Sequence, residues 1–249
     1  MRPLDPGFVA ACPREHGFRL RGLETTRIEV FVDAAFAFAV TMLVISFDAI
    51  PRNWDELMVA VKTIPAFAFA ISQVVWVWYE HVKWSRRFGT EDAATVFLST
   101  VLLIVVLVWI YPLRILAEGL FAWLTKGYLP QNFRLESYEQ LAGLFIFLGA
   151  GFASLCAVFA LFYAYAARQR VALRLDPAEL HATRTAAVTW AGSAAVGLVS
   201  AAAAVALPGP WTPFAGFAYV LVGLWISAFA RWRARGGPTK ASSDDPESR

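Results

Sequence analysis

A single carboxylate stands inside an otherwise apolar stretch near the amino terminus. In residues 30–47 the only strongly polar side chain is Asp33. A carboxylate is costly to place in a membrane, so it usually has a role, such as carrying a proton or joining helices through hydrogen bonds. The stretch is long enough to cross a hydrocarbon core of roughly 30 Å at about 1.5 Å per residue. It therefore predicts a transmembrane helix with a polar site built into it.

Partners for this carboxylate must come from another helix. Arg27 precedes Asp33 by six residues, which is about 240° around a helix, so the two cannot pair well on one face. The second apolar segment carries Trp78 and His81 at its inner end, at a depth similar to that of Arg27 and Asp33. A hydrogen-bonded cluster between helices would offset the cost of desolvating these groups. An aromatic-belt position for Trp78 and a solvated position for His81 explain the same spacing.

The sequence offers little for catalysis or metal binding. His16, His81 and His181 are scattered, and there is no HExxH, no phosphate-binding glycine loop and no nucleophile motif. Cys12 and Cys156 are far apart and outside any CxxC pair, so we expect neither a disulfide nor a zinc site. We predict that the protein is not an enzyme and holds no metal or cofactor.

The composition is that of a membrane protein. Hydrophobic residues make up 58% of the chain, charged residues 16%, and the mean hydropathy is +0.53. The pI near 9.0 suits nucleic-acid binding, but the basic residues lie in short segments between apolar runs, which membrane topology explains better. We predict an all-α, polytopic fold with six transmembrane helices. The apolar segments lie at residues 28–49, 58–81, 93–112, 140–167, 184–207 and 212–232.

The distribution of Lys and Arg predicts the orientation. The amino-terminal arm, the carboxyl-terminal tail and alternate connections carry 17 of these residues, against five in the other connections. The positive-inside rule then places both termini in the cytoplasm. We expect residues 1–26 to form a cytoplasmic arm without a cleaved signal peptide, 27–235 the six-helix domain, and 236–249 a disordered tail.

Two segments suggest how the later helices pack and connect. Ser193, Gly197 and Ala201 recur every four residues, which predicts a close approach to a neighbouring helix. The longest connection, 114–139, contains ILAEGLFAWL, which fits either an interfacial helix or a loop packed on the bundle.

The first helix resembles that of a known channel family. Residues 27–33, RIEVFVD, followed by AAFAFAVTMLVISF, are similar to the RxxxFSD signature of the transmembrane protein 175 family, the potassium channels of lysosomes and many bacteria. Ser72 and Trp78-x-x-His81 match a serine and a WxxH pattern in the family's second helix, and the proline of Tyr111-Pro112 matches the end of its third. Val32 replaces the signature serine. The resemblance implies a motif network of Arg27, Phe31, Asp33, Ser72, Trp78 and His81.

The same resemblance implies a homotetramer in the bacterial inner (plasma) membrane, with K+ ions passing a pore lined by the first helix. The constriction positions carried over are Phe38, Thr41 and Ile45, which share one helical stripe with Ala34. A ring of apolar side chains would gate by excluding water. Asp48 lies at the outer end, where a ring of carboxylates could concentrate cations.

Two alternatives to a potassium channel remain open. A proton-coupled secondary transporter could use Asp33 as its titrating group, although such folds usually break their helices and this segment contains no Gly or Pro. A noncatalytic membrane scaffold or sensor would make the cluster of Arg27 and Asp33 purely structural, which fits Val32 in place of the signature serine.

Overall fold

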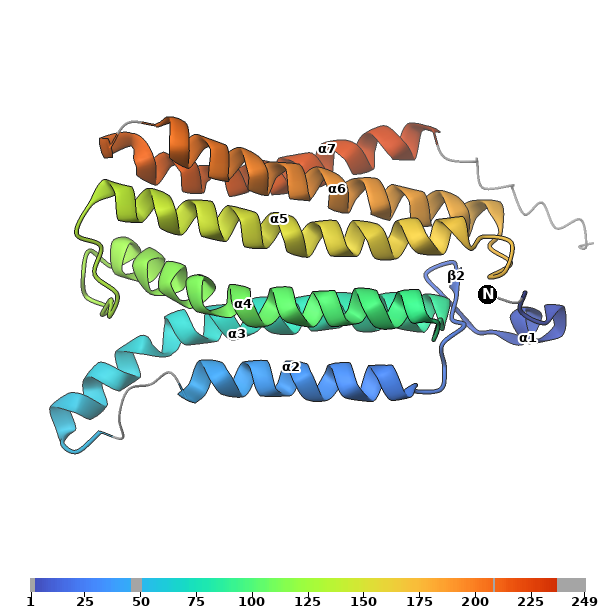
Figure 1. Cartoon of the computed structure of the whole chain (residues 1–249), viewed down its shortest axis with the longest axis horizontal. Coiled ribbons are helices and arrows are strands. Elements are labelled where there is room, and N and C mark those ends of the chain that lie inside the picture. The colour runs from blue at the N-terminus through green and yellow to red at the C-terminus, as the bar shows by residue number, and fades with distance from the viewer. Residues whose placement is uncertain (1–2, 46–50, 208, 237–249) are drawn as a thin grey trace, which may run out of the picture.

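The computed structural model describes residues 3–45, 51–207 and 209–236, with the side chains of 44, 45 and 230–236 left out. Long helices run side by side along one axis to form a bundle (Figure 1). The helices of the bundle are α2 (Arg27–Ile45), α3 (Trp54–Phe88), α4 (Ala93–Leu124), α5 (Tyr138–Arg168), α6 (Pro177–Ala206), the 3-10 helix η1 (Gly209–Tyr219) and α7 (Val220–Gly236).

Local capping residues set where several of these helices begin and end. Asn53, Asp92 and Asp176 precede α3, α4 and α6, and each side chain accepts a hydrogen bond from a backbone N–H in the first turn. Asp176 and Glu179 complete a reciprocal capping box. Gly89 ends α3 in the left-handed conformation, with φ of 57°, which glycine adopts without strain.

Five helices of the described residues are long and apolar enough to cross a membrane: α3, α4, α5, α6 and the segment Gly209–Phe229. The predicted helical membrane protein is therefore confirmed. The predicted first span corresponds to α2, which has 19 residues. Residues 46–50, which follow it, lie outside the described residues, as does most of the tail predicted to be disordered, 237–249.

The predicted end of the third helix at Tyr111-Pro112 is wrong. α4 continues through Pro112 to Leu124, so ILAEGLFAWL is neither a separate interfacial helix nor a loop. A proline removes one backbone donor and bends a helix, but buried side chains on both sides can keep the helix going. Leu113 and Ala117 are both buried just beyond the proline. Figure 1 shows the second part of α4 changing direction.

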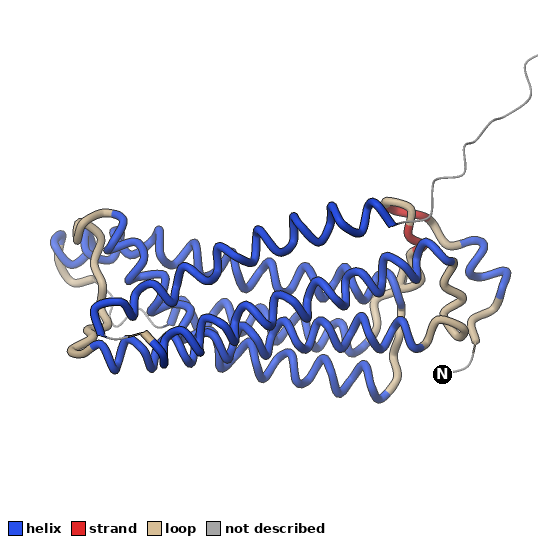
Figure 2. Tube along the Cα trace, turned by 90° about the horizontal axis from the view of Figure 1, so that it is seen from above, coloured by secondary structure: helices blue, strands red, loops and turns tan. Residues whose placement is uncertain are grey.

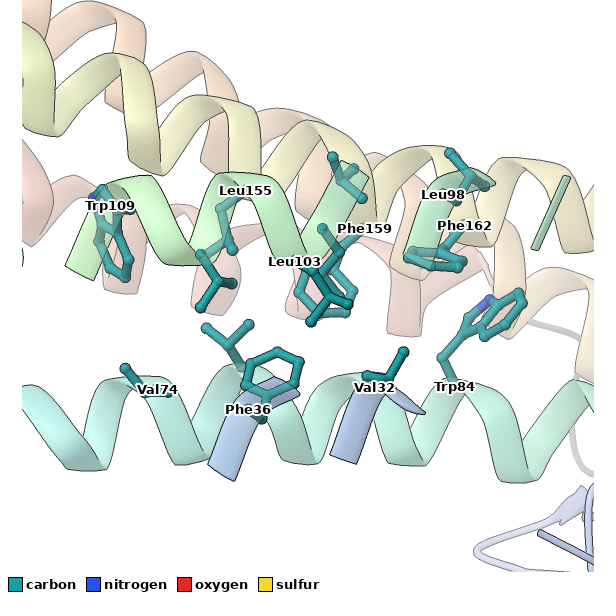
Figure 3. Close-up of a cluster of buried hydrophobic side chains, with 14 of the residues drawn as sticks. Val32, Phe36, Val74, Trp84, Leu98, Leu103, Trp109, Leu155, Phe159 and Phe162 are labelled. Atoms are coloured by element: carbon teal, nitrogen blue, oxygen red, sulfur yellow. The ribbon is translucent and has the colours of Figure 1, made fainter. Parts of the chain in front are cut away.

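A continuous apolar core holds α2 and α3 against α4 and α5. Side chains from all four helices meet in it, as Figure 3 shows from the side. The labelled members are Val32, Phe36, Val74, Trp84, Leu98, Leu103, Trp109, Leu155, Phe159 and Phe162. Burial of these apolar side chains fixes which faces of α2 and α3 are turned toward the bundle.

Small residues bring α5 and α6 into close contact. A Cβ atom added to Gly149 would lie 2.6 Å from the carbonyl oxygen of Gly197, and one added to Gly197 would lie 2.8 Å from that of Gly149. The close approach predicted from the spacing of Ser193, Gly197 and Ala201 is confirmed.

The amino-terminal arm is folded against one end of the bundle. It contains α1 (Pro6–Ala11) and a hairpin of β1 (Arg14–Glu15) and β2 (Phe18–Arg19). The arm, the α3–α4 turn and the α5–α6 turn lie at the same end, here called the arm end (Figure 1), and Figure 2 shows the hairpin there. Phe18 is buried and packs edge-on against Phe88, with ring centroids 5.5 Å apart.

A buried ion pair joins the arm to α6. The Nη2 atom of Arg21 lies 2.6 Å from Glu179 Oε2, and both side chains are 0% exposed. Arg21 Nε also donates to the carbonyl oxygen of Leu173, at 2.9 Å. Nearby, the Gly22 N–H donates to the Arg86 carbonyl at 3.0 Å. The arm thus links the α5–α6 turn to the end of α3.

Glu179→Gln should destabilise the protein by about 3 kcal/mol, because Arg21 would stay buried without a counter-charge. Glutamine can still serve in the capping box, so the substitution tests the charge rather than the cap. Thermal unfolding of the purified protein in detergent measures the effect. Arg14→Gln is the control, because Arg14 is half exposed and lies 3.5 Å from Asp176. Equal losses from the two substitutions would contradict the expectation.

Candidate functional site

The carboxylate of the first helix has its partner on the second. Trp78 Nε1 donates to Asp33 Oδ1 at 2.7 Å, so a hydrogen bond joins α2 to α3. A cleft of about 270 Å³ lies beside this bond, and its other lining residues are apolar. They are Phe36, Ala37, Val40, Val74 and Val75. Asp33 therefore sits in a largely apolar setting with one strong donor.

His81 joins α3 to α4 instead of to α2. Only 2% of the residue is exposed, and its Nε2 lies 3.2 Å from the hydroxyl oxygen of Ser99. The ring also meets the ring of Phe162 edge-on, at 5.6 Å between centroids. The solvated position considered for His81 is therefore wrong, and Ser99 is a partner that sequence reasoning missed.

A third polar link fixes the start of α2. The Thr26 N–H donates to Glu29 Oε2 at 2.7 Å, and the Glu29 N–H donates to the Thr26 hydroxyl at 3.2 Å. The Ser85 hydroxyl donates to the second oxygen of the same carboxylate. Sequence reasoning missed this link, although T-x-x-E before an apolar run is a capping-box pattern and Ser85 follows His81 by one helical turn.

Three motif residues lie apart from these links within the single chain. Arg27 and Phe31 are exposed, and Arg27 makes no hydrogen bond or ion pair with the described residues. Ser72 is also exposed, and its hydroxyl donates to the carbonyl of Phe69 in its own helix at 2.7 Å. None of these three residues takes part in the polar links between helices described above.

Val32 lies where the resemblance expects a serine, and it is fully buried in the apolar core. A methyl-bearing side chain fits this environment without needing a hydrogen-bond partner. Val32 therefore adds apolar packing between α2 and its neighbours.

The two faces of α2 differ sharply. Val32, Phe36, Ala39 and Leu43 are buried against the bundle. The opposite face carries exposed residues at helical spacing, here called the open face of α2. It consists of Arg27, Val30, Phe31, Ala34, Ala37, Phe38 and Thr41.

Two of the predicted constriction residues belong to this open face. Phe38 is 57% exposed, and the Thr41 hydroxyl donates to the Ala37 carbonyl at 2.9 Å. Ile45 is the last residue of α2, and its side chain lies outside the described residues. Asp48 lies outside them altogether.

Comparison with known proteins identifies the relatives of this chain. The sequence model of the family described as "Endosomal/lysosomal potassium channel TMEM175" matches residues 27–109. A potassium channel of Marivirga tractuosa is 32% identical over 216 residues, which cover 82% of this chain and 85% of that protein. The chain belongs to the TMEM175 family.

The TMEM175 fold is matched as well. The crystal structure of a variant of the potassium channel MtTMEM175, in complex with a nanobody–MBP fusion protein, has a TM-score of 0.78 and 28% identity. The match covers 89% of this chain and 99% of that one. TMEM175 proteins are potassium channels rather than enzymes, which agrees with the lack of catalytic motifs.

The family match spans the part of the chain that carries the polar links of α2 and α3 described above. Residues 27–109 contain α2, α3 and about the first half of α4. The links from Asp33 to Trp78 and from His81 to Ser99 both fall within this range. The TMEM175 region is therefore a group of three mutually packed helices in which hydrogen bonds between side chains join α2 to α3 and α3 to α4.

Trp78→Phe should destabilise the subunit by about 2 kcal/mol, because Asp33 would lose its N–H donor in an apolar setting. Asp33→Ala should cost a similar amount, and Asp33→Asn less, because asparagine keeps an acceptor oxygen. Unfolding in detergent, followed by intrinsic fluorescence, compares these variants. Trp123→Phe, at an exposed position on α4, is the control. A loss no larger than that of the control would contradict the expectation.

Proposed function

We propose that this chain is one subunit of a homotetrameric potassium channel in the bacterial inner membrane, with the open face of α2 lining a central pore. The observation that carries this proposal is the open face itself. It is uncovered in the single chain, although the opposite face of the same helix is packed into the core. Membership of the TMEM175 family supports potassium as the ion.

The composition of the open face favours packing around an axis over contact with lipid alone. Ala34 and Ala37 are small enough to let helices approach one another. Arg27 at one end and Thr41 toward the other are polar, which a purely lipid-facing stripe would not require. Copies of α2 around a pore would cover this face.

The proposed membrane orientation follows from the positions of the arm and of the turns between helices. In the proposed topology α2 is the sixth span, added to the five long apolar helices, and both termini are cytoplasmic. The arm, the α3–α4 turn and the α5–α6 turn lie together at the arm end (Figure 1). Lys and Arg gather in the arm, in the last two turns of α3 and around the α5–α6 turn. The positive-inside rule makes the arm end cytoplasmic.

Phe38 would form the narrowest part of this pore. A ring of phenyl groups admits hydrated ions only when it is wide enough to stay wet, so it acts as a hydrophobic gate. Thr41 lies about one helical turn farther along, and its hydroxyl donates to a carbonyl, which leaves oxygen lone pairs for a cation or its water. Ile45 would add a second apolar ring, and Asp48 a ring of carboxylates at the outer mouth.

Phe38→Ala should raise the potassium flux several-fold, because a methyl group replaces the phenyl ring at the constriction. Potassium currents of the purified protein in a planar lipid bilayer measure this. The control is Phe97→Ala, since Phe97 is 67% exposed but lies on α4. An unchanged conductance in an otherwise functional channel would mean that Phe38 does not line the pore.

The same bilayer measurement separates the two other functions. A saturable flux that depends on a proton gradient and disappears in Asp33→Asn would indicate a proton-coupled transporter. Absence of any flux would indicate a scaffold or sensor. The bond from Trp78 to Asp33 favours a structural role for this carboxylate within a channel.

Arg27→Ala should weaken the tetramer while leaving the subunit folded, because Arg27 is exposed and has no partner within the described chain. Native mass spectrometry in detergent would show a larger fraction of monomers, and circular dichroism would show unchanged helix content. Arg184→Ala, at an exposed position on α6, is the matched control. A stable Arg27→Ala tetramer with altered ion preference would place Arg27 in the ion path instead.

A further inference from the structure

A second cavity lies away from α2. It has a volume of about 630 Å³ and is formed by α3, α5, α6 and α7. It runs along α6 from His181 to Ser193, a distance of about 18 Å for 12 residues at about 1.5 Å each. One leaflet of a bilayer has a hydrocarbon thickness of about 15 Å, so this groove is as long as one leaflet is deep.

The groove is charged at one end and apolar along the rest. Lys83 and Arg87 lie near the end of α3, and His181 lies near the start of α6, all toward the arm end. Farther along, the walls are made of large apolar side chains. They are Trp76, Phe152, Trp190, Val222 and Ile226.

The hydroxyl groups in the groove already have hydrogen-bond acceptors within α6. Thr185, Thr189 and Ser193 each donate to the carbonyl four residues earlier in α6, at 2.8, 2.9 and 3.1 Å. Trp76 and Trp190 lie 5.6 Å apart between ring centroids and add a broad apolar wall. The middle of the groove therefore suits a hydrocarbon chain.

The charged end has one cation more than it has carboxylates. Lys83 Nζ lies 2.6 Å from Glu80 Oε1, so these two charges compensate each other. The guanidinium carbon of Arg87 lies 5.1 Å from the ring centroid of Phe18, and the side chain is near Tyr163, but it pairs with no carboxylate in the described part of the chain. An arginine without a counter-charge at a membrane interface attracts an anionic lipid headgroup.

We propose that this groove binds one anionic phospholipid from the leaflet at the arm end. The phosphate lies beside Arg87 and Lys83, and one acyl chain runs along Trp76 and Trp190. This inference rests on the proposed function only for the orientation of the helices in the membrane. The lipid would join α3, α5, α6 and α7 on the side of the subunit away from the open face of α2.

Native mass spectrometry of the delipidated protein in detergent tests the proposal. Phosphatidylglycerol and phosphatidylcholine with the same acyl chains are added in parallel, and bound lipid is counted per subunit. We expect the wild type to retain phosphatidylglycerol several-fold better than phosphatidylcholine. The double variant Lys83→Gln/Arg87→Gln should lose most of this preference. Arg86→Gln should keep it, because Arg86 is exposed on the same turn of α3 but does not line the groove.

A second variant tests the apolar part of the groove. Ala186→Phe places a ring in the wall and should reduce retention of both lipids, without removing a charge. It also keeps the test decisive if the double variant fails to fold, since Arg87 contacts Phe18 and Tyr163. Equal retention of phosphatidylglycerol in the charge variants and in Arg86→Gln would overturn the proposal. So would full displacement of the lipid by glycerol phosphate, because the site would then bind the headgroup alone.

These measurements need no ion flux, so the two proposals fail separately. Selective retention of phosphatidylglycerol by a protein that conducts no potassium would refute the channel and support the lipid site. Potassium currents with unselective lipid retention would do the reverse.

Discussion

A polar group inside a membrane-spanning segment is stable only when the protein itself supplies its hydrogen-bond partner. This constraint determines how α2, α3 and α4 meet. Asp33 has Trp78, His81 has Ser99, and each bond joins two different helices. The apolar core between these links gives attraction without direction, whereas the hydrogen bonds fix the register of the helices. The two kinds of contact are therefore complementary.

The same constraint explains why α2 can present an open face. On the face of α2 that is turned toward the bundle, Asp33 is hydrogen-bonded to α3 and the large apolar side chains pack in the core. Burial of Phe36, Ala39 and Leu43 fixes the rotation of α2 about its axis, and this rotation determines where Phe38 and Thr41 point. The proposed pore depends on such support, because a constriction is useful only if its side chains keep a defined position.

The helices and the contact between Asp33 and Trp78 could be predicted from the sequence, because hydropathy and the cost of a buried carboxylate are local signals. The end of α4 could not, since whether a helix ends at Pro112 depends on how its neighbours bury Leu113 and Ala117. The pairing of Arg21 with Glu179 could not be predicted from the sequence either. These residues are 158 positions apart, and nothing in the sequence around either one indicates the other. Ser99 was missed because a lone serine in an apolar helix usually bonds its own backbone.

The docking of the arm has a consequence for the order in which the chain can fold. Arg21 is made before any helix of the bundle, and its counter-charge, Glu179, is made only at the start of α6. Gly22 and Gly89 must also meet closely, since a Cβ atom on Gly89 would lie 2.8 Å from the Arg21 carbonyl. The ion pair that buries Arg21 therefore cannot form until the start of α6 has been synthesised. In a chain that stops before α6, Arg21 has no Glu179 with which to pair. A docked arm therefore indicates a subunit whose helices through the start of α6 are in place.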